Sequence, residues 1–437
     1  MSLTSSNTKA IKTPQTTELS FWWLGSGALV YGLLQTIIRL GLDLRDLPGS
    51  ASTLSILYAS NDTRGLDVAG YAFKWWTYWV GFDLETAIWL TSILSGLGMV
   101  LGTTLLGNAI WNRQVGAWTG VFTACWALTQ QLGVLVGVDG IAIGCTWLGL
   151  GLLTTALHHR SHWGILCLPL AWWLLPLGIN AKSIALPSLV AFSILVLPIT
   201  HWKRWLLGMV SSAVVASTIS RTEDHRVVAP DSNWNTLEHG WHRLSDFGKR
   251  GLQEGDFQNL WILGGCCTLW MLYTTIRKRQ HTSWNTLSPT LLTLFLWLAT
   301  GVGLCITAAG LGELSRPRYL VGLGIGLLLP IAGLTHTLSR QAARFFGGTV
   351  VFALLMNTWG FFGQWGLVRQ NMLGGEASSI PTAPWIWGKK YQRYPTITLR
   401  DLTIVGALDF QDTWQTLSDN KGIATPRLRD DRHRNLQ

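Results

Sequence analysis

Three basic side chains stand where apolar runs of the sequence begin, and each could bind a phosphate group. Lys182 lies in the short polar turn 180–183, and Arg316 and Arg318 flank a proline ahead of a later run. A guanidinium can bind phosphate or pyrophosphate through two parallel hydrogen bonds, and a Lys ammonium acts on it as a compact charge. The alternative is membrane anchoring, in which Lys182 snorkels to the lipid head groups and the arginines contact them.

Asp139 is an acid between two apolar runs, in the glycine-flanked turn 137–140. A carboxylate so close to hydrocarbon is costly, so it is by default a hypothesis for a functional site. The alternative is that Asp139 caps the helix that follows it.

Further acids gather in the polar stretch 39–83. Residues 61–64 (Asn-Asp-Thr-Arg) form a compact polar cluster. Residues 64–80 mix aromatic rings with cations, as in an amphipathic helix that lies at a membrane interface. The alternative is an aromatic anchor belt with solvated charges. The charged candidates in this stretch are Asp62, Asp67, Asp46, Asp43 and Arg64.

Histidine and cysteine patterns give little support for a metal centre. His239 and His242 would share one face of a helix near several acids, but their spacing matches no recognised zinc motif. The six cysteines fall in apolar runs without a CxxC pair, which favours buried thiols over disulfides or zinc. Whether a divalent metal ion is used stays open. The glycine sets 144, 149, 151 and 322, 324, 326 are typical of close helix packing rather than of nucleotide loops.

The composition indicates which elements must hold these groups. The chain has 437 residues, of which 48% are hydrophobic and only 13% are charged, against about 25% charged in a typical soluble domain. These figures exclude a disordered protein, a collagen-like chain and an ordinary soluble enzyme. They predict an all-α polytopic membrane protein. The apolar runs are continuous rather than alternating, which argues against a strand barrel.

Apolar runs long enough to cross a bilayer recur along most of the chain. A spanning helix needs about 20 mostly apolar residues, and about eleven runs approach that length. The predicted spans are residues 20–38, 84–106, 115–137, 141–157, 163–179, 183–200, 204–220, 258–276, 287–310, 319–337 and 345–365.

The loops between these spans predict an orientation. The polar residues 1–19 precede an uncleaved first span, and we expect them to be cytoplasmic. The inner connections are then short and basic, as the positive-inside rule requires. All acids except Glu18 then fall at the outer side, which indicates that polar chemistry is concentrated there. Longer outer loops are the alternative explanation.

The same topology predicts the domain organisation. A transmembrane domain covers residues 20–365, with partly helical outer loops at 39–83 and 221–257. The tail, residues 366–437, is extracytoplasmic and too small for a core of its own unless it packs on those loops. The net charge of +10 comes from basic residues between apolar runs. Anionic lipids or phosphate-bearing substrates are therefore the expected partners, and nucleic acid is not.

Five segments in this order resemble the GT-C class of membrane glycosyltransferases, in particular the bacterial branch of aminoarabinose and protein O-mannosyl transferases. The resemblance covers roughly residues 20–340. Its segments are an acid-Thr-Arg motif at 62–64, the stretch 79–87 before the second span, Asp139 at the start of the fourth span, a Lys-containing turn at Lys182, and the Arg-Tyr-Leu opening of a late span at Arg318 and Tyr319. The chain departs from the class in having Asn61-Asp62 where an acidic pair is common.

The resemblance implies transfer of a sugar from a polyprenyl-phosphate donor to an acceptor on the outer face of a bacterial inner membrane. It implies that Asp62 is the catalytic base. Asp67, Asp46 and Asp43 are the next candidates for this role. Asp139 would orient the acceptor, hold a divalent ion or assist the base. The residues that would offset charge on the leaving phosphate are Lys182 and Arg318, then Arg316, Arg64 and Tyr319.

A non-catalytic alternative is a GT-C-like membrane subunit that scaffolds a larger complex of partner membrane proteins. The departure at Asn61-Asp62 favours this alternative. A secondary transporter is disfavoured, because such proteins hold ionisable groups near the bilayer midplane whereas the charges here lie at the ends of spans.

Overall fold

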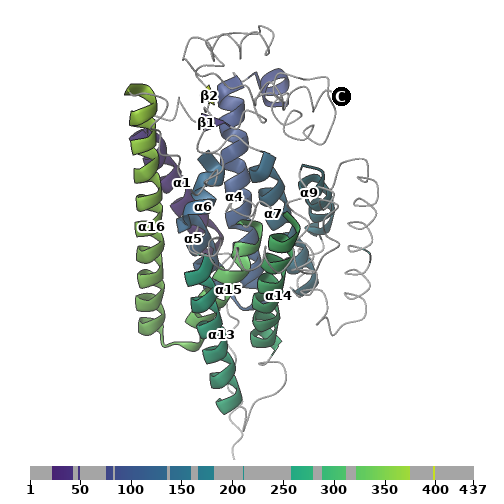
Figure 1. Cartoon of the computed structure of the whole chain (residues 1–437). Helices are drawn as coiled ribbons and strands as arrows, with labels where there is room; N and C mark the ends of the chain where they lie inside the picture. The colour runs from purple at the N-terminus through teal and green to yellow at the C-terminus, as the bar shows by residue number, and fades with distance from the viewer. Residues whose placement is uncertain are drawn as a thin grey trace, which may run out of the picture.

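The chain forms an upright bundle of helices in a computed structural model (Figure 1). The structure describes residues 22–42, 48–49, 75–81, 84–134, 138–158, 166–181, 210, 257–278, 288–311, 321–374 and 397–398. The helices of the first half are α1 (Trp22–Leu42), η2 (Trp75–Val80), α4 (Leu84–Ile110), α5 (Arg113–Cys125), α6 (Ala127–Val134), α7 (Val138–His158) and α9 (Leu168–Ala181). Those of the second half are α13 (Phe257–Lys278), α14 (Ser288–Leu311), α15 (Val321–Thr337) and α16 (Arg340–Gly374).

Every predicted span that falls on described residues coincides with helix, while spans 183–200 and 204–220 lie outside the description, residue 210 apart. Three of the described helices are long and apolar enough to cross a membrane: Trp89–Ile110, Gly140–Leu157 and Asn259–Arg277. The protein is therefore an integral membrane protein with a helical bundle. The number of spans stays a prediction.

The predicted span 115–137 is not one helix, because the chain breaks at Trp126 into α5 and α6. Trp126 has extended backbone (φ −74°, ψ 129°), and the backbone N–H of Thr129 donates to the carbonyl of Trp126 instead of that of Cys125. The hydroxyl of Thr358, on α16, donates to the Cys125 carbonyl at 2.6 Å. Irregular backbone is tolerated at membrane depth only where the protein satisfies it, as Thr358 does here.

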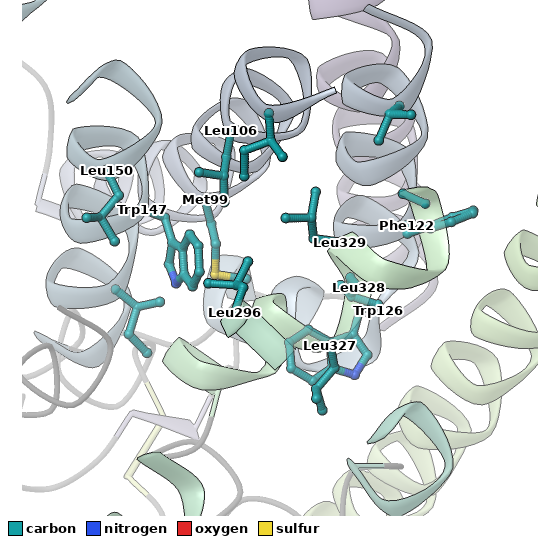
Figure 2. Close-up of a cluster of buried hydrophobic side chains, with 14 of the residues drawn as sticks. Met99, Leu106, Phe122, Trp126, Trp147, Leu150, Leu296, Leu327, Leu328 and Leu329 are labelled. Atoms are coloured by element: carbon teal, nitrogen blue, oxygen red, sulfur yellow. The ribbon is translucent and has the colours of Figure 1, made fainter. Parts of the chain in front are cut away.

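The core of the bundle lies where α4, α5, α7, α14 and α15 meet. Figure 2 shows Met99 and Leu106 of α4 facing Trp147 of α7 and the leucines of α15. Glycines let α4 and α7 approach each other closely, since a Cβ on Gly151 would strike the backbone of Gly102, on α4. The predicted packing role of the α7 glycines is thereby confirmed, because small residues let membrane helices approach closely.

At one end of the bundle, several predicted inner connections lie together. The side chain of Asn112 caps α5 by accepting from the Val115 N–H at 3.0 Å, and it lies 2.8 Å from Nδ1 of His336, at the end of α15. Trp111 donates from Nε1 to the hydroxyl of Thr293, near the start of α14, at 2.9 Å. The end of α4 and the start of α5 therefore share a side with the end of α15 and the start of α14, as an alternating topology requires.

At the other end, a short antiparallel pair joins the first outer loop to the tail (Figure 1). Strand β1 (Pro48–Gly49) pairs with β2 (Ile397–Thr398), with Pro48 opposite Thr398. This pairing brings residues 48–49 of the predicted first outer loop against residues 397–398 of the predicted tail. Helix η2 also lies within the predicted interfacial stretch. It ends at Val80 and is followed by Gly81, which has a positive φ of 80°. Residues 64–74 lie outside the description.

Candidate functional site

Of the predicted site residues, only Asp139 lies on described backbone. The other predicted acids and phosphate-binding residues fall outside the described part of the chain, so their roles stay predictions. They are Asp62, Asp67, Asp46, Asp43, Lys182, Arg318, Arg316, Arg64 and Tyr319. The site can therefore be built only from Asp139 and from the described residues near it.

Asp139 is the second residue of α7, in the first turn of that helix. A Cβ built on its neighbour Gly140 would lie 3.3 Å from the carbonyl oxygen of Leu132 and 3.5 Å from Cβ of Ser95. Gly140, the residue after Asp139, thus lies close to the end of α6 and the side of α4. An acid in the first turn also interacts favourably with the helix dipole, so the capping alternative stays open.

Arg39, three residues before the end of α1, contacts the end of α6, which precedes α7 in the chain. Its Nη2 donates to the carbonyl of Gly133 at 2.8 Å, and its Nε donates to Oε1 of Gln35 at 3.3 Å. Its guanidinium carbon lies 4.5 Å from the ring centroid of Trp89, on α4. The three groups that hold Arg39 are all neutral, so no described side chain balances its charge.

A buried amide network fixes the helices around Arg39. Nε2 of Gln35 donates to Oε1 of Gln130 at 2.7 Å and to the Gln130 carbonyl at 2.9 Å. Nε2 of Gln130 donates in turn to the carbonyl of Ala124. Both glutamines are buried, and a buried polar network whose members are satisfied holds its elements in one arrangement. The position of α1 against α6, and with it the position of Arg39, is therefore well defined.

Several buried polar atoms near these helix ends have no hydrogen-bond partner among the residues that the structure describes. They are Nη1 of Arg39, Nε1 of Trp89, Oγ1 of Thr129, and both Nε2 and Oε1 of Gln131. All belong to α1, α4 or α6. Buried polar groups are nearly always hydrogen-bonded in native proteins, so unused donors in a cluster call for an explanation.

Arg39 contacts the end of α6, and Asp139 lies in the first turn of α7, the next described helix. Arg39 binds the carbonyl of Gly133, and the residue after Asp139 packs on the carbonyl of Leu132, the preceding residue. One predicted site acid and a cation that the sequence analysis did not select therefore share one end of the bundle. The signal for Arg39 was its type alone, since an Arg near the end of an apolar run is usually a head-group contact.

Metal-binding groups are not found in the described part of the chain. No cluster of three or more His, Cys, Asp or Glu side chains occurs among those residues, and the divalent ion stays an open prediction. The five cysteines whose side chains the structure describes are free thiols. Burial is confirmed for Cys125 and Cys267, whereas Cys145 and Cys167 are partly buried and Cys266 is exposed.

No family model matches the sequence, and no curated protein matches it. Two solved structures are similar to it in fold. The first is ArnT from Cupriavidus metallidurans bound to undecaprenyl phosphate, with 17% identity and a TM-score of 0.48 over 82% of this chain and 67% of that one. The second is ArnT from the same organism in the apo state, with 16% identity and a TM-score of 0.46 over 82% of this chain and 66% of that one.

The chain spans about two thirds of the length of those ArnT chains. Undecaprenyl phosphate is a ligand of that protein.

Proposed function

We propose that this protein is a GT-C-like membrane glycosyltransferase that moves a sugar from a polyprenyl-phosphate-linked donor to an acceptor on the outer face. The observation that supports the proposal is that Arg39 binds the end of α6 at Gly133, close to the first turn of α7, which carries Asp139. An acid, and a cation whose charge no described side chain balances, are the two kinds of group that such a transfer requires. The carboxylate can act on the acceptor, and the cation can offset the charge of a phosphate.

The remaining roles follow the sequence resemblance. Asp62 is the base, with Asp67, Asp46 and Asp43 as further acids of the first outer loop. Asp139 orients the acceptor, assists the base or holds a divalent ion. The donor phosphate contacts four cations and one tyrosine, which come from three segments of the chain. These residues are Lys182, Arg318, Arg316, Arg64 and Tyr319. The apolar tail of the donor lies between helices, which is why the catalyst is a membrane protein.

The proposed topology is that of a bacterial inner-membrane protein. Residues 1–19 are cytoplasmic, residues 20–365 form the transmembrane domain and residues 366–437 form an extracytoplasmic tail. The loops 39–83 and 221–257 then lie on the same outer face as the tail. The pairing of β1 with β2 supports a shared side for the first loop and the tail.

A non-catalytic scaffold is the second candidate, and the outward face of α16 favours it. Phe345, Phe352 and Trp359 are all strongly exposed on this long helix. A membrane subunit could use such a face to bind partner membrane proteins. Lipid tails would cover the same face in an enzyme that acts alone.

Mass spectrometry of the full-length protein, gently purified from its native membrane, distinguishes the two functions. A glycosyltransferase is expected to carry a stoichiometric polyprenyl phosphate that is lost in Lys182→Ala and Arg318→Ala. A scaffold is expected to carry a fixed set of proteins and no such lipid. The matched control is Arg344→Ala, which removes an exposed arginine at the start of α16.

Activity provides the second half of the test. In vesicles with a polyprenyl-phosphate sugar, Asp62→Asn and Asp139→Asn should each lower transfer by about 10²-fold or more, because general base catalysis contributes on that order. The lipid should stay bound in both variants. Asp430→Asn, in the charged end of the tail, is the matched control. Unchanged transfer in both Asp62→Asn and Asp139→Asn would overturn the assignment of the acids.

A further inference from the structure

The guanidinium of Arg39 has an incomplete set of partners for a buried cation. Two of its nitrogens donate to neutral oxygens, those of Gly133 and Gln35. The third, Nη1, is buried and has no hydrogen-bond partner among the described residues. Taking a charge out of water is strongly unfavourable unless an opposite charge or further hydrogen bonds compensate it.

Trp89 adds a second unused donor at the same place. Its indole lies under the Arg39 guanidinium, with the guanidinium carbon 4.5 Å from the ring centroid. Its Nε1 is likewise buried and without a hydrogen-bond partner in the described part of the chain. A buried Trp N–H usually finds an acceptor. The stacked pair therefore presents two N–H donors and one positive charge with no described acceptor between them.

The depth of this pair in the membrane indicates what acceptor is available. Arg39 comes 17 residues after Trp22, the first residue of α1, which at about 1.5 Å per residue is about 26 Å along the helix. Since a bilayer core is about 30 Å thick, Arg39 lies near the level of the lipid phosphates. Basic pockets between membrane helices at this level are suited to phosphate head groups.

The surrounding helices hold the pair ready for a ligand. The Gln35–Gln130 network fixes α1 against α6, and the bond from Arg39 to Gly133 orients the guanidinium. A Cβ on Gly133 would strike the hydroxyl of Tyr31 and the amide of Gln35, so this close approach requires glycine. An arginine that is already oriented loses less side-chain entropy when an anion binds.

We infer that Arg39 and Trp89 form a phosphate-binding site between the ends of α1 and α4. Nη1 of Arg39 and Nε1 of Trp89 donate to oxygens of one phosphate group, and the charge of Arg39 balances that of the ligand. The inference deepens the proposed function and rests on it where the phosphate is that of a polyprenyl donor, whereas binding itself needs only a phosphate at the membrane surface. The phosphate can be a monoester on a polyprenyl chain, a phosphodiester of an anionic phospholipid, or free phosphate.

The rival occupant is a carboxylate of the same chain. Glu85 lies one helical turn before Trp89, Asp139 lies beyond the Gly133 carbonyl, and Asp43 follows Arg39 by four residues. None of these side chains is among those that the structure describes. The experiment must therefore separate an external phosphate from an internal ion pair.

Native mass spectrometry of the full-length protein can make this separation. Three probes are titrated separately: undecaprenyl phosphate, phosphatidylglycerol and inorganic phosphate, the last also as a competitor of the lipids. The variants are Arg39→Gln and Trp89→Phe. The second variant keeps an aromatic ring under the guanidinium and removes only the N–H donor. The matched controls are Arg344→Gln and Trp359→Phe, which alter exposed side chains of α16.

We expect Arg39→Gln to weaken binding of at least one probe by about tenfold or more, since hydrogen bonds to charged groups contribute about that factor. Trp89→Phe should weaken the same probe by a smaller factor, and the controls should stay within about twofold. Loss of undecaprenyl phosphate alone identifies the monoester as the ligand. Loss of both lipids identifies a general lipid-phosphate site, and competition by inorganic phosphate identifies recognition of the group without its tail.

Wild-type binding of all three probes in both variants would overturn the inference. So would a result in which Arg39→Gln lowers only thermal stability and Glu85→Gln, Asp43→Asn or Asp139→Asn lowers it equally, because the cation would then be paired internally. If Arg39→Gln does not fold, Trp89→Phe decides the question. Lys182→Ala and Arg318→Ala are titrated in parallel, so that failure of the proposed donor site is seen separately.

Discussion

Gln35 and Gln130 are two buried amides that bind each other between α1 and α6, and Gln35 also accepts from Arg39. Neither glutamine is among the functional residues predicted from the sequence, and Arg39 is not among them either. A lone polar residue in an apolar run can face lipid, a loop or another helix, and only the packing of α1 on α6 decides which. Asp139 could be selected, because an acid near hydrocarbon is costly in any of those environments.

The two glutamines should behave as a unit. Gln35→Leu or Gln130→Leu alone should destabilise the protein by about 1–3 kcal/mol, because each leaves a buried amide unpaired. The double variant should cost less than the sum of the single variants, since it removes both partners. Thermal unfolding of the four proteins in one detergent measures the coupling. Strictly additive effects would show that the two amides do not stabilise each other.

At the scale of elements, hydropathy alone placed the described helices well. Runs such as 84–106 and 258–276 coincide with α4 (Leu84–Ile110) and α13 (Phe257–Lys278), because about 20 apolar residues in a row have few other stable structures. The break at Trp126 could not be predicted in this way. It depends on Thr358, which lies 233 residues away in the chain and supplies the donor for the Cys125 carbonyl.

Removing that donor should destabilise the junction of α5 and α6. Thr358→Val keeps the shape of the side chain and removes the hydroxyl, so the buried Cys125 carbonyl loses its partner at a cost of about 1–3 kcal/mol. Thr349→Val is the control, since the exposed hydroxyl of Thr349 bonds only within its own helix, to Phe345. Equal melting temperatures for the two variants would show that Thr358 does not support the break.

At the scale of the whole molecule, the two ends of the bundle separate the predicted inner connections from the first loop and the tail. Asn112 and His336 meet at one end, and Pro48 pairs with Thr398 at the other. Sequence analysis predicted this division from the alternation of spans and basic loops. It could not predict the pairing of loop with tail, since two-residue strands leave no periodic signal.

Cysteine labelling in intact cells can test the orientation. Thr398→Cys should react with a membrane-impermeant maleimide from outside, whereas Ser339→Cys, in the exposed turn before α16, should react only after permeabilisation. The parent protein measures the background labelling of its own six cysteines. The reverse pattern would place the phosphate-binding pair and Asp139 at the cytoplasmic side.

The pairing of β1 with β2 also sets an order for biosynthesis. Residues 48–49 leave the ribosome long before residues 397–398, since about 350 residues separate the two strands. Between these events the intervening helices are synthesised, while the first loop has no strand partner. The β1–β2 pair can therefore form only after residues 397–398 have been synthesised, so a nascent chain that stops before them leaves Pro48 and Gly49 without this partner.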